Sequence, residues 1–227
     1  GGRFYGGWWQ NVPSQYRKYI EINHKPIVEI DYSGHHIRLL YDQENLQAPD
    51  DAYAIEGFDR DSLKEIMLIM INCRSRRQAM KTLEYMDAID PETAKTMAKL
   101  LIEKHNLIGK YFYTGIGLEL MYKDSVIAER VMLEMLKRGA TVLPVHDSFI
   151  VRNSYEEELK EVMENEYQKL HFNQPKAKRN LTALEEKVAH RPDVDIHNYL
   201  GGNLELNLDS METNYKRFLE VWGCTSL

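Results

Sequence analysis

Two apolar runs interrupt a mixed pattern of polar and hydrophobic residues, one at residues 26–32 and the other at residues 141–151. Both are rich in Val and Ile and too short for an ordinary helix, so both predict buried β-strands. Ser33-Gly34 ends the first strand. Polar residues at 146–148 divide the second run, which predicts a hairpin with its tip at these positions.

Apolar residues at helical spacing predict helices between and after these strands. The predicted helices cover residues 36–41, 62–72, 74–86, 91–105, 124–137, 154–170 and 211–222. Asp124 is the expected N-cap of its helix, and Ser154 with Glu157 forms a capping-box pattern. The basic cluster at 176–179 predicts a solvated loop. This order of elements predicts an α+β fold with an antiparallel sheet.

Composition narrows the class of protein. At 227 residues and 43% apolar, the chain is long enough for one sizeable core or two small subdomains. Its net charge of −6 means that nucleic acid would need a locally basic surface. Cys73 and Cys224 are far apart and lack zinc spacing, which predicts a reducing, cytoplasmic location. No stretch approaches the ~20 apolar residues of a membrane span. The chain starts at Gly1 within what reads as a motif, which predicts a piece of a longer protein.

Each predicted strand segment carries one carboxylate at or near its end, Asp31 in the first and Asp147 in the second. A buried Asp is costly unless it is paired or bound to a cation. Two Asp on neighbouring strands can hold a pair of divalent ions for phosphoryl transfer. Two ordinary strand-end Asp residues are the other interpretation, and either segment taken alone favours it.

Four short blocks follow one another along the chain. They are Gly2-Arg3 with Gln10-Asn11-Val12-Pro13, Asp31-Tyr32-Ser33 with Arg38, Arg77 with Lys81 and Tyr85, and Val145-His146-Asp147-Ser148. In this order they resemble the T-G-R…Q-N-I-P segment and motifs A, B and C of family A (polymerase I-like) DNA polymerases. They are similar too to the related single-subunit phage-type RNA polymerases. The resemblance covers residues 1–151, and nothing specific is recognised in 171–227.

The resemblance implies a polymerase palm with an antiparallel sheet and a reduced helical fingers subdomain. The palm would comprise residues 1–42 and 140–170, the fingers residues 43–139, and residues 171–227 would be a C-terminal extension of unknown role. The span between the two Asp is shorter than in usual members, so the fingers must be trimmed. The thumb that would precede the first residue is absent, so we expect an upstream segment or a separate protein partner.

The implied activity is that of a template-directed nucleotidyltransferase, a DNA polymerase or primase-polymerase that uses a DNA primer-template and nucleoside triphosphates. Asp31, Asp147 and the backbone carbonyl of Tyr32 would hold two Mg²⁺ (or Mn²⁺) ions. The implied nucleotide-binding residues are Arg77, Lys81, Tyr85 and His36. The implied nucleic-acid-binding residues are Arg3, Gln10, Asn11, Arg17 and His146.

Spacing supports one part of this set, because residues 77, 81 and 85 are four apart and would share one helix face. A cationic face that ends in an aromatic residue suits a triphosphate, a sugar and a base. Taken alone, however, the same pattern also fits a solvated basic helix face.

The residue beside the sugar departs from the family pattern. His36 follows Asp31 by five residues, where DNA-making relatives have Glu and RNA-making relatives have Gly. Motif B also lacks its later Gly and Tyr, and Ile89 stands where the Tyr would be. The bulk of His36 predicts discrimination against a 2′-hydroxyl, whereas its N–H and the missing Tyr predict tolerance. We therefore expect partial selectivity, with dNTPs preferred and rNTPs used.

Two other functions compete with this interpretation. One is a catalytically inactive palm-like module that binds nucleic acid or a partner, against which the retention of both Asp with Arg77 and Lys81 speaks. The other is a metal phosphohydrolase built on His35, His36, His146 and Asp147. Such sites usually mount the His-Asp pair on a helix, whereas residues 141–151 predict strand and turn.

Overall fold

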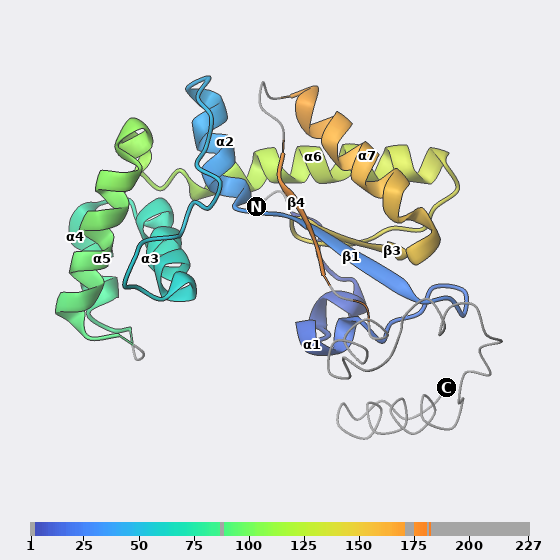
Figure 1. Ribbon diagram of the computed structural model, residues 1–227, viewed down its shortest axis with the longest axis horizontal. Helices are drawn as coiled ribbons and strands as arrows, with labels where there is room; N and C mark the ends of the chain where they lie inside the picture. The colour runs from blue at the N-terminus through green and yellow to red at the C-terminus, as the bar shows by residue number, and fades with distance from the viewer. Residues whose placement is uncertain (1–2, 87–88, 171–174, 181, 183–227) are drawn as a thin grey trace. The chain divides into compact units, whose positions relative to one another are not determined.

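A four-stranded antiparallel sheet is the central element of the computed structural model, which describes residues 3–86, 89–170, 175–180 and 182 (Figure 1). The strands are β1 (Ile27–Tyr32), β2 (Leu143–Val145), β3 (Ser148–Arg152) and β4 (Ala177–Arg179), in the order β2-β3-β1-β4. The predicted α+β class, antiparallel sheet and hairpin are confirmed. The predicted helix at 211–222 lies outside the described residues.

Helices account for most of the remaining described chain. The α-helices are α1 (Ser14–Arg17), α2 (His35–Gln43), α3 (Arg60–Asn72), α4 (Arg76–Leu83), α5 (Pro91–Lys104), α6 (Gly117–Lys137) and α7 (Glu156–Gln168). Short 3₁₀ helices are η1 (Trp8–Asn11), η2 (Asn106–Tyr111) and η3 (Asn153–Tyr155). Helices α3, α4 and α5 pack together, and α6 packs against α7. In the described part of the chain, no helix is long and apolar enough to cross a membrane.

The two faces of the sheet bury different groups. Val28, Ile30 and Tyr32 of β1 belong to the main core, which also contains apolar residues of α6 and α7. Ile27 belongs instead to a smaller core that it forms with residues of β2, β3 and the N-terminal segment. Because successive strand side chains alternate between faces, Asp31 lies on this second face. Figure 1 shows α1 on the other side of the sheet from α6 and α7.

Strand β4 corrects the predicted loop at 176–179. Its residues pair antiparallel with the end of β1, Lys178 opposite Asp31 and Ala177 opposite Tyr32. The pairing satisfies backbone groups of β1 that would otherwise form an open sheet edge, and Lys residues are typical of edge strands. Three residues are too few to show strand alternation in the sequence.

Three helix boundaries also differ from the prediction. Helix α6 begins at Gly117 rather than at the expected cap Asp124, which is buried inside the helix. Helix α7 follows η3 and has no side-chain cap, so the predicted capping box of Ser154 does not form. Helix α4 ends at Leu83, and Tyr85 lies in the turn that follows. The alignment of residues 77, 81 and 85 on one helix therefore extends only to Lys81.

Candidate active site

Strand pairing brings Asp31, near the end of β1, beside the β2–β3 turn that carries Asp147. Asp31 of β1 is paired in register with Ser148 of β3, and Asp147 immediately precedes Ser148. The backbone N–H of Tyr32 donates to the Asp147 carbonyl oxygen at 3.2 Å. The ladder therefore continues into the hairpin turn and sets both Asp at the same end of the sheet.

The hairpin turn has a strained backbone. Val145 pairs with Ser148, so the loop has two residues, and His146 has a φ of 58°. Two-residue hairpin loops need positive φ, which favours Gly or Asn at this position. Strain of this kind clusters at functional sites. His146 is exposed, with its ring 5.9 Å from the ring of Tyr5, and therefore remains accessible for the nucleic-acid contact predicted for it.

Electrostatics at Asp31 favour a cation. Burial raises the pKa of the Asp31 carboxyl and the charge of Asp147 raises it further, while the charge of Lys178 lowers it. The Oδ1 atom of Asp31 is buried, and no described residue hydrogen-bonds to it. A half-buried carboxylate beside a second carboxylate is stabilised by a bound positive charge. The charge partner Lys178 escaped the sequence analysis because its segment was assigned to a loop.

The candidate metal ligands fit a site in which the protein supplies few ligands and leaves the other coordination positions to water and substrate. Within the described ranges, no group of three or more His, Cys, Asp or Glu residues could hold a metal ion. Mg²⁺ usually takes one or two carboxylates from the protein and completes its octahedral oxygen shell with water and substrate phosphates. Asp31, Asp147 and the Tyr32 carbonyl match that chemistry, with the unpartnered Asp31 Oδ1 as the observation that supports the fit.

The raised pKa of Asp31 predicts opposite pH effects with and without metal. A divalent ion binds the ionised carboxylate, so its stabilisation of the fold should fade as pH falls through the raised pKa. Without metal, the folded state binds the Asp31 proton more tightly than the unfolded state does. The Asp31 contribution to the free energy of unfolding therefore increases as pH falls through that pKa toward 3.8, the ordinary pKa of an aspartate. Thermal unfolding from pH 4 to 7, with EDTA or Mg²⁺, measures both; equal profiles for Asp31→Asn and the wild type would contradict the assignment.

His36 and Arg3 meet in a charged cluster near this site. Arg3 Nη2 lies 3.4 Å from His36 Nε2, and Arg3 Nε donates to Asp124 Oδ2 at 2.9 Å. Asp124 Oδ1 lies 3.4 Å from His35 Nε2. Burial, followed by the charge of His35, lowers the pKa of His36 to about 4, while Asp147 acts in the opposite direction. The sequence analysis missed Asp124 because Asp is also a common helix cap.

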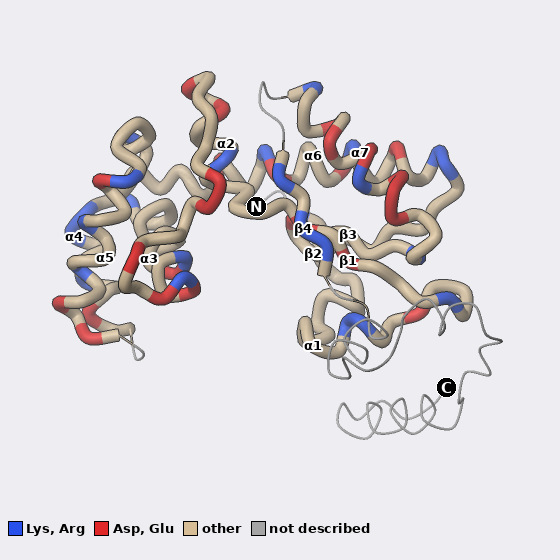
Figure 2. The backbone as a smooth tube through the Cα atoms, in the orientation of Figure 1, with Lys and Arg blue, Asp and Glu red and all other residues tan. Residues whose placement is uncertain are grey.

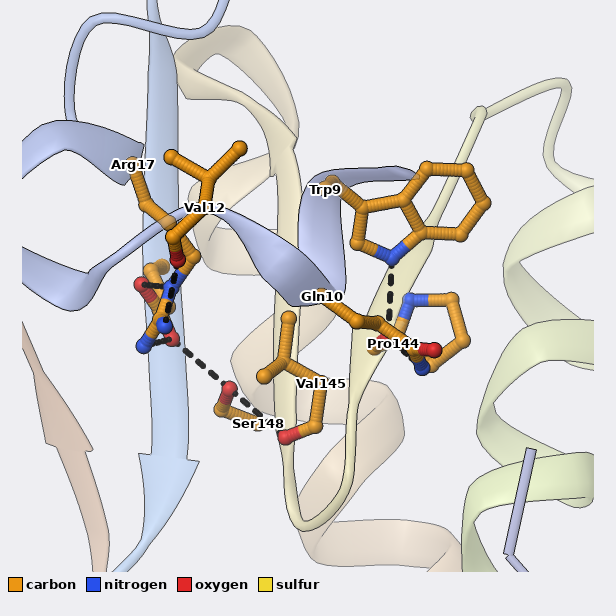
Figure 3. Close-up of polar contacts among 8 residues, drawn as sticks. Trp9, Gln10, Val12, Arg17, Pro144, Val145 and Ser148 are labelled. Carbon is orange, nitrogen blue, oxygen red and sulfur yellow. Dashed lines mark hydrogen bonds and ion pairs between the residues drawn. The ribbon is translucent and has the colours of Figure 1, made fainter. Parts of the chain in front are cut away.

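Other residues predicted to bind nucleic acid form hydrogen bonds within the protein instead (Figure 3). Arg17 donates to Glu29 through Nε at 3.0 Å and through Nη2 at 2.8 Å. The side-chain amide of Gln10 donates to the Pro144 carbonyl at 2.9 Å, as does the indole of Trp9. These contacts attach the N-terminal segment to β1 and β2 and so help to position the hairpin that carries Asp147. Nucleic-acid contacts by Arg17 and Gln10 stay predictions.

The remaining predicted residues lie at the surface. Arg77, Lys81 and Tyr85 are all exposed, Tyr85 by 74%, and Figure 2 shows basic residues along α4. Asn11 is exposed as well. Helix α4 packs against α3 and α5, whereas the two Asp lie in the sheet and its hairpin. The predicted nucleotide-binding residues thus divide between α4 with the turn that follows it and the region of His36.

Comparisons with known proteins add a distant structural likeness. No protein-family model matches the chain, and no curated protein matches it. Among solved structures it is similar to the POL domain of Pol1 from M. smegmatis, in complex with DNA primer-template and dNTP. The TM-score is 0.47 and the sequence identity 11% over 75% of this chain, which spans 43% of that chain. A likeness of this extent carries no argument by itself, so the proposal below rests on the residues of the site.

Proposed function

We propose that this chain is a template-directed nucleotidyltransferase, a DNA polymerase or primase-polymerase that joins a nucleoside triphosphate to a primer 3′-hydroxyl. The observation that carries the proposal is the placement of Asp31 and Asp147 at one end of adjacent antiparallel strands. The unpartnered buried oxygen of Asp31 and its raised pKa add that this pair suits a cation. In this proposal residues 1–42 and 140–170 form the palm and residues 43–139 the fingers.

Asp31, Asp147 and the Tyr32 carbonyl would hold Mg²⁺ or Mn²⁺. When bound, such ions neutralise phosphate charge and lower the pKa of a hydroxyl nucleophile. The chain itself supplies positioning, which is most of what phosphoryl transfer requires of a protein. The strands fix both carboxylates, and the exposed His146 and Asn11 are available to the primer-template. Arg77 and Lys81 would pair with the triphosphate, and Tyr85 with the sugar and base.

Primer extension tests this function. A labelled DNA primer on a template is incubated with the chain and dNTPs or rNTPs, with Mg²⁺, with Mn²⁺ or with EDTA. Metal-dependent elongation supports the proposal. Binding of the primer-template without elongation in either metal would favour the alternative, a catalytically inactive palm-like binding module.

The exposed cations of α4 give a prediction about substrate affinity. Replacing Lys81 or Arg77 by Ala should raise the KM for the triphosphate roughly 10- to 150-fold, because each removes a charge-assisted phosphate contact worth roughly 1.5–3 kcal/mol. Neither change should unfold the chain, since both side chains are exposed. Steady-state incorporation kinetics provide the measurement. Lys99→Ala on α5, another exposed cation of the helical region, is the matched control and should leave the KM unchanged.

His36 gives a prediction about the sugar. His36→Gly should raise rNTP incorporation with little loss for dNTPs, because it removes the bulk expected beside the sugar C2′. A change of about tenfold in the ratio of kcat/KM values is expected, the scale of one pocket contact. Competition between a dNTP and its matching rNTP on one template measures that ratio directly. An unchanged ratio would show that His36 does not lie beside the sugar.

A further inference from the structure

His36 is contacted by a residue from a distant part of the chain. It lies in the first turn of α2 and is only partly exposed. Its Nε2 lies 3.4 Å from Nη2 of Arg3, which belongs to the N-terminal segment. The orientation of the His36 ring therefore depends on where the Arg3 guanidinium is held.

A buried carboxylate holds that guanidinium. Arg3 Nε donates to Oδ2 of Asp124 at 2.9 Å, and the Asp124 side chain is only 2% exposed. Burial by itself would raise the pKa of Asp124, but its neighbours His35 and Arg3 outweigh burial and lower it. Asp124 is thus ionised at neutral pH. A buried ionised carboxylate needs its partner, which makes the Arg3–Asp124 pair a rigid support.

The same contact selects a tautomer of His36. With a pKa of about 4, the imidazole is neutral at pH 7. An arginine N–H can only donate, so Nε2 of the neutral ring is the acceptor and the proton lies on Nδ1. Arg3 therefore specifies both the orientation of the ring and which of its nitrogens is a donor.

We propose that Arg3 and Asp124 are positioning residues for sugar selection, which hold His36 in one orientation and one tautomer at the incoming nucleotide. This inference rests on the proposed function. A bulky side chain discriminates between sugars only when it is held rigid, since a mobile ring would move away from a 2′-hydroxyl. The ion pair between the N-terminal segment and α6 supplies that support.

Single-nucleotide incorporation tests the proposal. The ratio of kcat/KM values for a dNTP and its matching rNTP is compared among the wild type, Arg3→Gln, Asp124→Asn and His36→Gly. Arg3→Gln and Asp124→Asn should each lower the ratio about fivefold to tenfold, approaching the effect of His36→Gly. Arg3→Gln combined with His36→Gly should match His36→Gly alone, because both changes act through the same ring.

A control and a second readout separate this effect from loss of structure. Arg138→Gln breaks another ion pair of α6, Arg138 with Glu161 at the C-terminal end of the helix, without a described contact to His36, and should leave the ratio unchanged. NMR of the His36 ring nitrogens should show the Nδ1–H tautomer in the wild type and a mixture of tautomers in Arg3→Gln. The NMR experiment needs no activity and uses a variant changed outside the core, so it stands if Asp124→Asn fails to fold.

Two results would overturn the inference: an unchanged ratio in Arg3→Gln, or an Arg3→Gln effect of full size in the His36→Gly background. A wild-type chain that incorporates neither nucleotide would instead contradict the proposed function. The His36 tautomer observed by NMR would then decide whether Arg3 positions the ring. The same tautomer in Arg3→Gln as in the wild type would overturn the positioning role of Arg3.

Discussion

Replacing Asp31 or Asp147 by Asn should reduce nucleotide incorporation about a thousandfold or more, the scale of loss when a group that acts as part of a catalytic unit is removed. The amide keeps the shape of the side chain but loses the charge that a divalent ion requires. The double variant should be no worse than either single variant, because one lost ligand already disables the pair. Single-turnover incorporation at saturating Mg²⁺ is the measurement.

Asp31→Asn should increase the stability of the metal-free protein although it abolishes activity. In the absence of metal, its ionised carboxylate is disfavoured by burial and by Asp147, as its raised pKa indicates. Asp31→Asn removes that repulsion, so the midpoint of thermal unfolding at pH 7 in EDTA should rise as activity disappears. Loss of activity with a higher midpoint is typical of a functional group held at a cost to stability. A variant that keeps wild-type activity would contradict the metal site.

The second large effect concerns the ion pair between Arg17 and Glu29, which stabilises the strand that carries Asp31. Arg17→Ala should lower the free energy of unfolding by about 3 kcal/mol or more, because it leaves a buried carboxylate without its partner. Glu29 accepts two hydrogen bonds from Arg17, through Nε and Nη2, and a third from Ser148 Oγ at 2.8 Å. It lies on β1 two residues before Asp31, so the loss would loosen the strand that positions the site. Chemical denaturation measures the change.

Two variants make this test specific. Arg138→Ala breaks a more exposed pair, Arg138 with Glu161, and should lower the free energy of unfolding far less, because solvent screens exposed ion pairs. Adding Glu29→Gln to Arg17→Ala should recover part of the lost stability, because it removes the unpaired charge. If Arg17→Ala costs no more than Arg138→Ala, the pair does not support the sheet.

Local patterns in the sequence were sufficient for much of the fold. The Val- and Ile-rich runs at 26–32 and 141–151 predicted β1 and the hairpin, because few other structures bury such short apolar segments. The helix predicted from Pro91 is α5, and the structure adds its cap, because the Asp90 side chain accepts from the Thr93 N–H. That Asp31 and Asp147 share one site was implied by the resemblance, and the register pairs Asp31 with Ser148, the residue that follows Asp147.

Contacts between distant segments were not visible in those patterns. Arg3 and Asp124 are 121 residues apart, and neither belongs to an apolar or helical pattern that points to the other. Gly115 and Gly117 are poor helix formers, so the sequence did not predict the first turns of α6, and Asp124 resembled its N-cap. Gln10 was assigned to nucleic acid by resemblance and Arg17 as a candidate phosphate contact, whereas the Pro144 carbonyl and Glu29 receive their hydrogen bonds in the structure. Long-range pairing of polar groups needs the fold before it can be predicted.

Incorporation opposite a chosen template base tests the central claim most directly. Four primer-templates that differ only in the first unpaired template base are offered each dNTP separately, with Mg²⁺, to the wild type and to Asp147→Asn. We predict that the wild type adds the complementary nucleotide on each template, only with a divalent ion, and that Asp147→Asn adds none. Failure of the folded wild-type chain to add any nucleotide with Mg²⁺ or Mn²⁺, or addition that ignores the template base, would contradict the account.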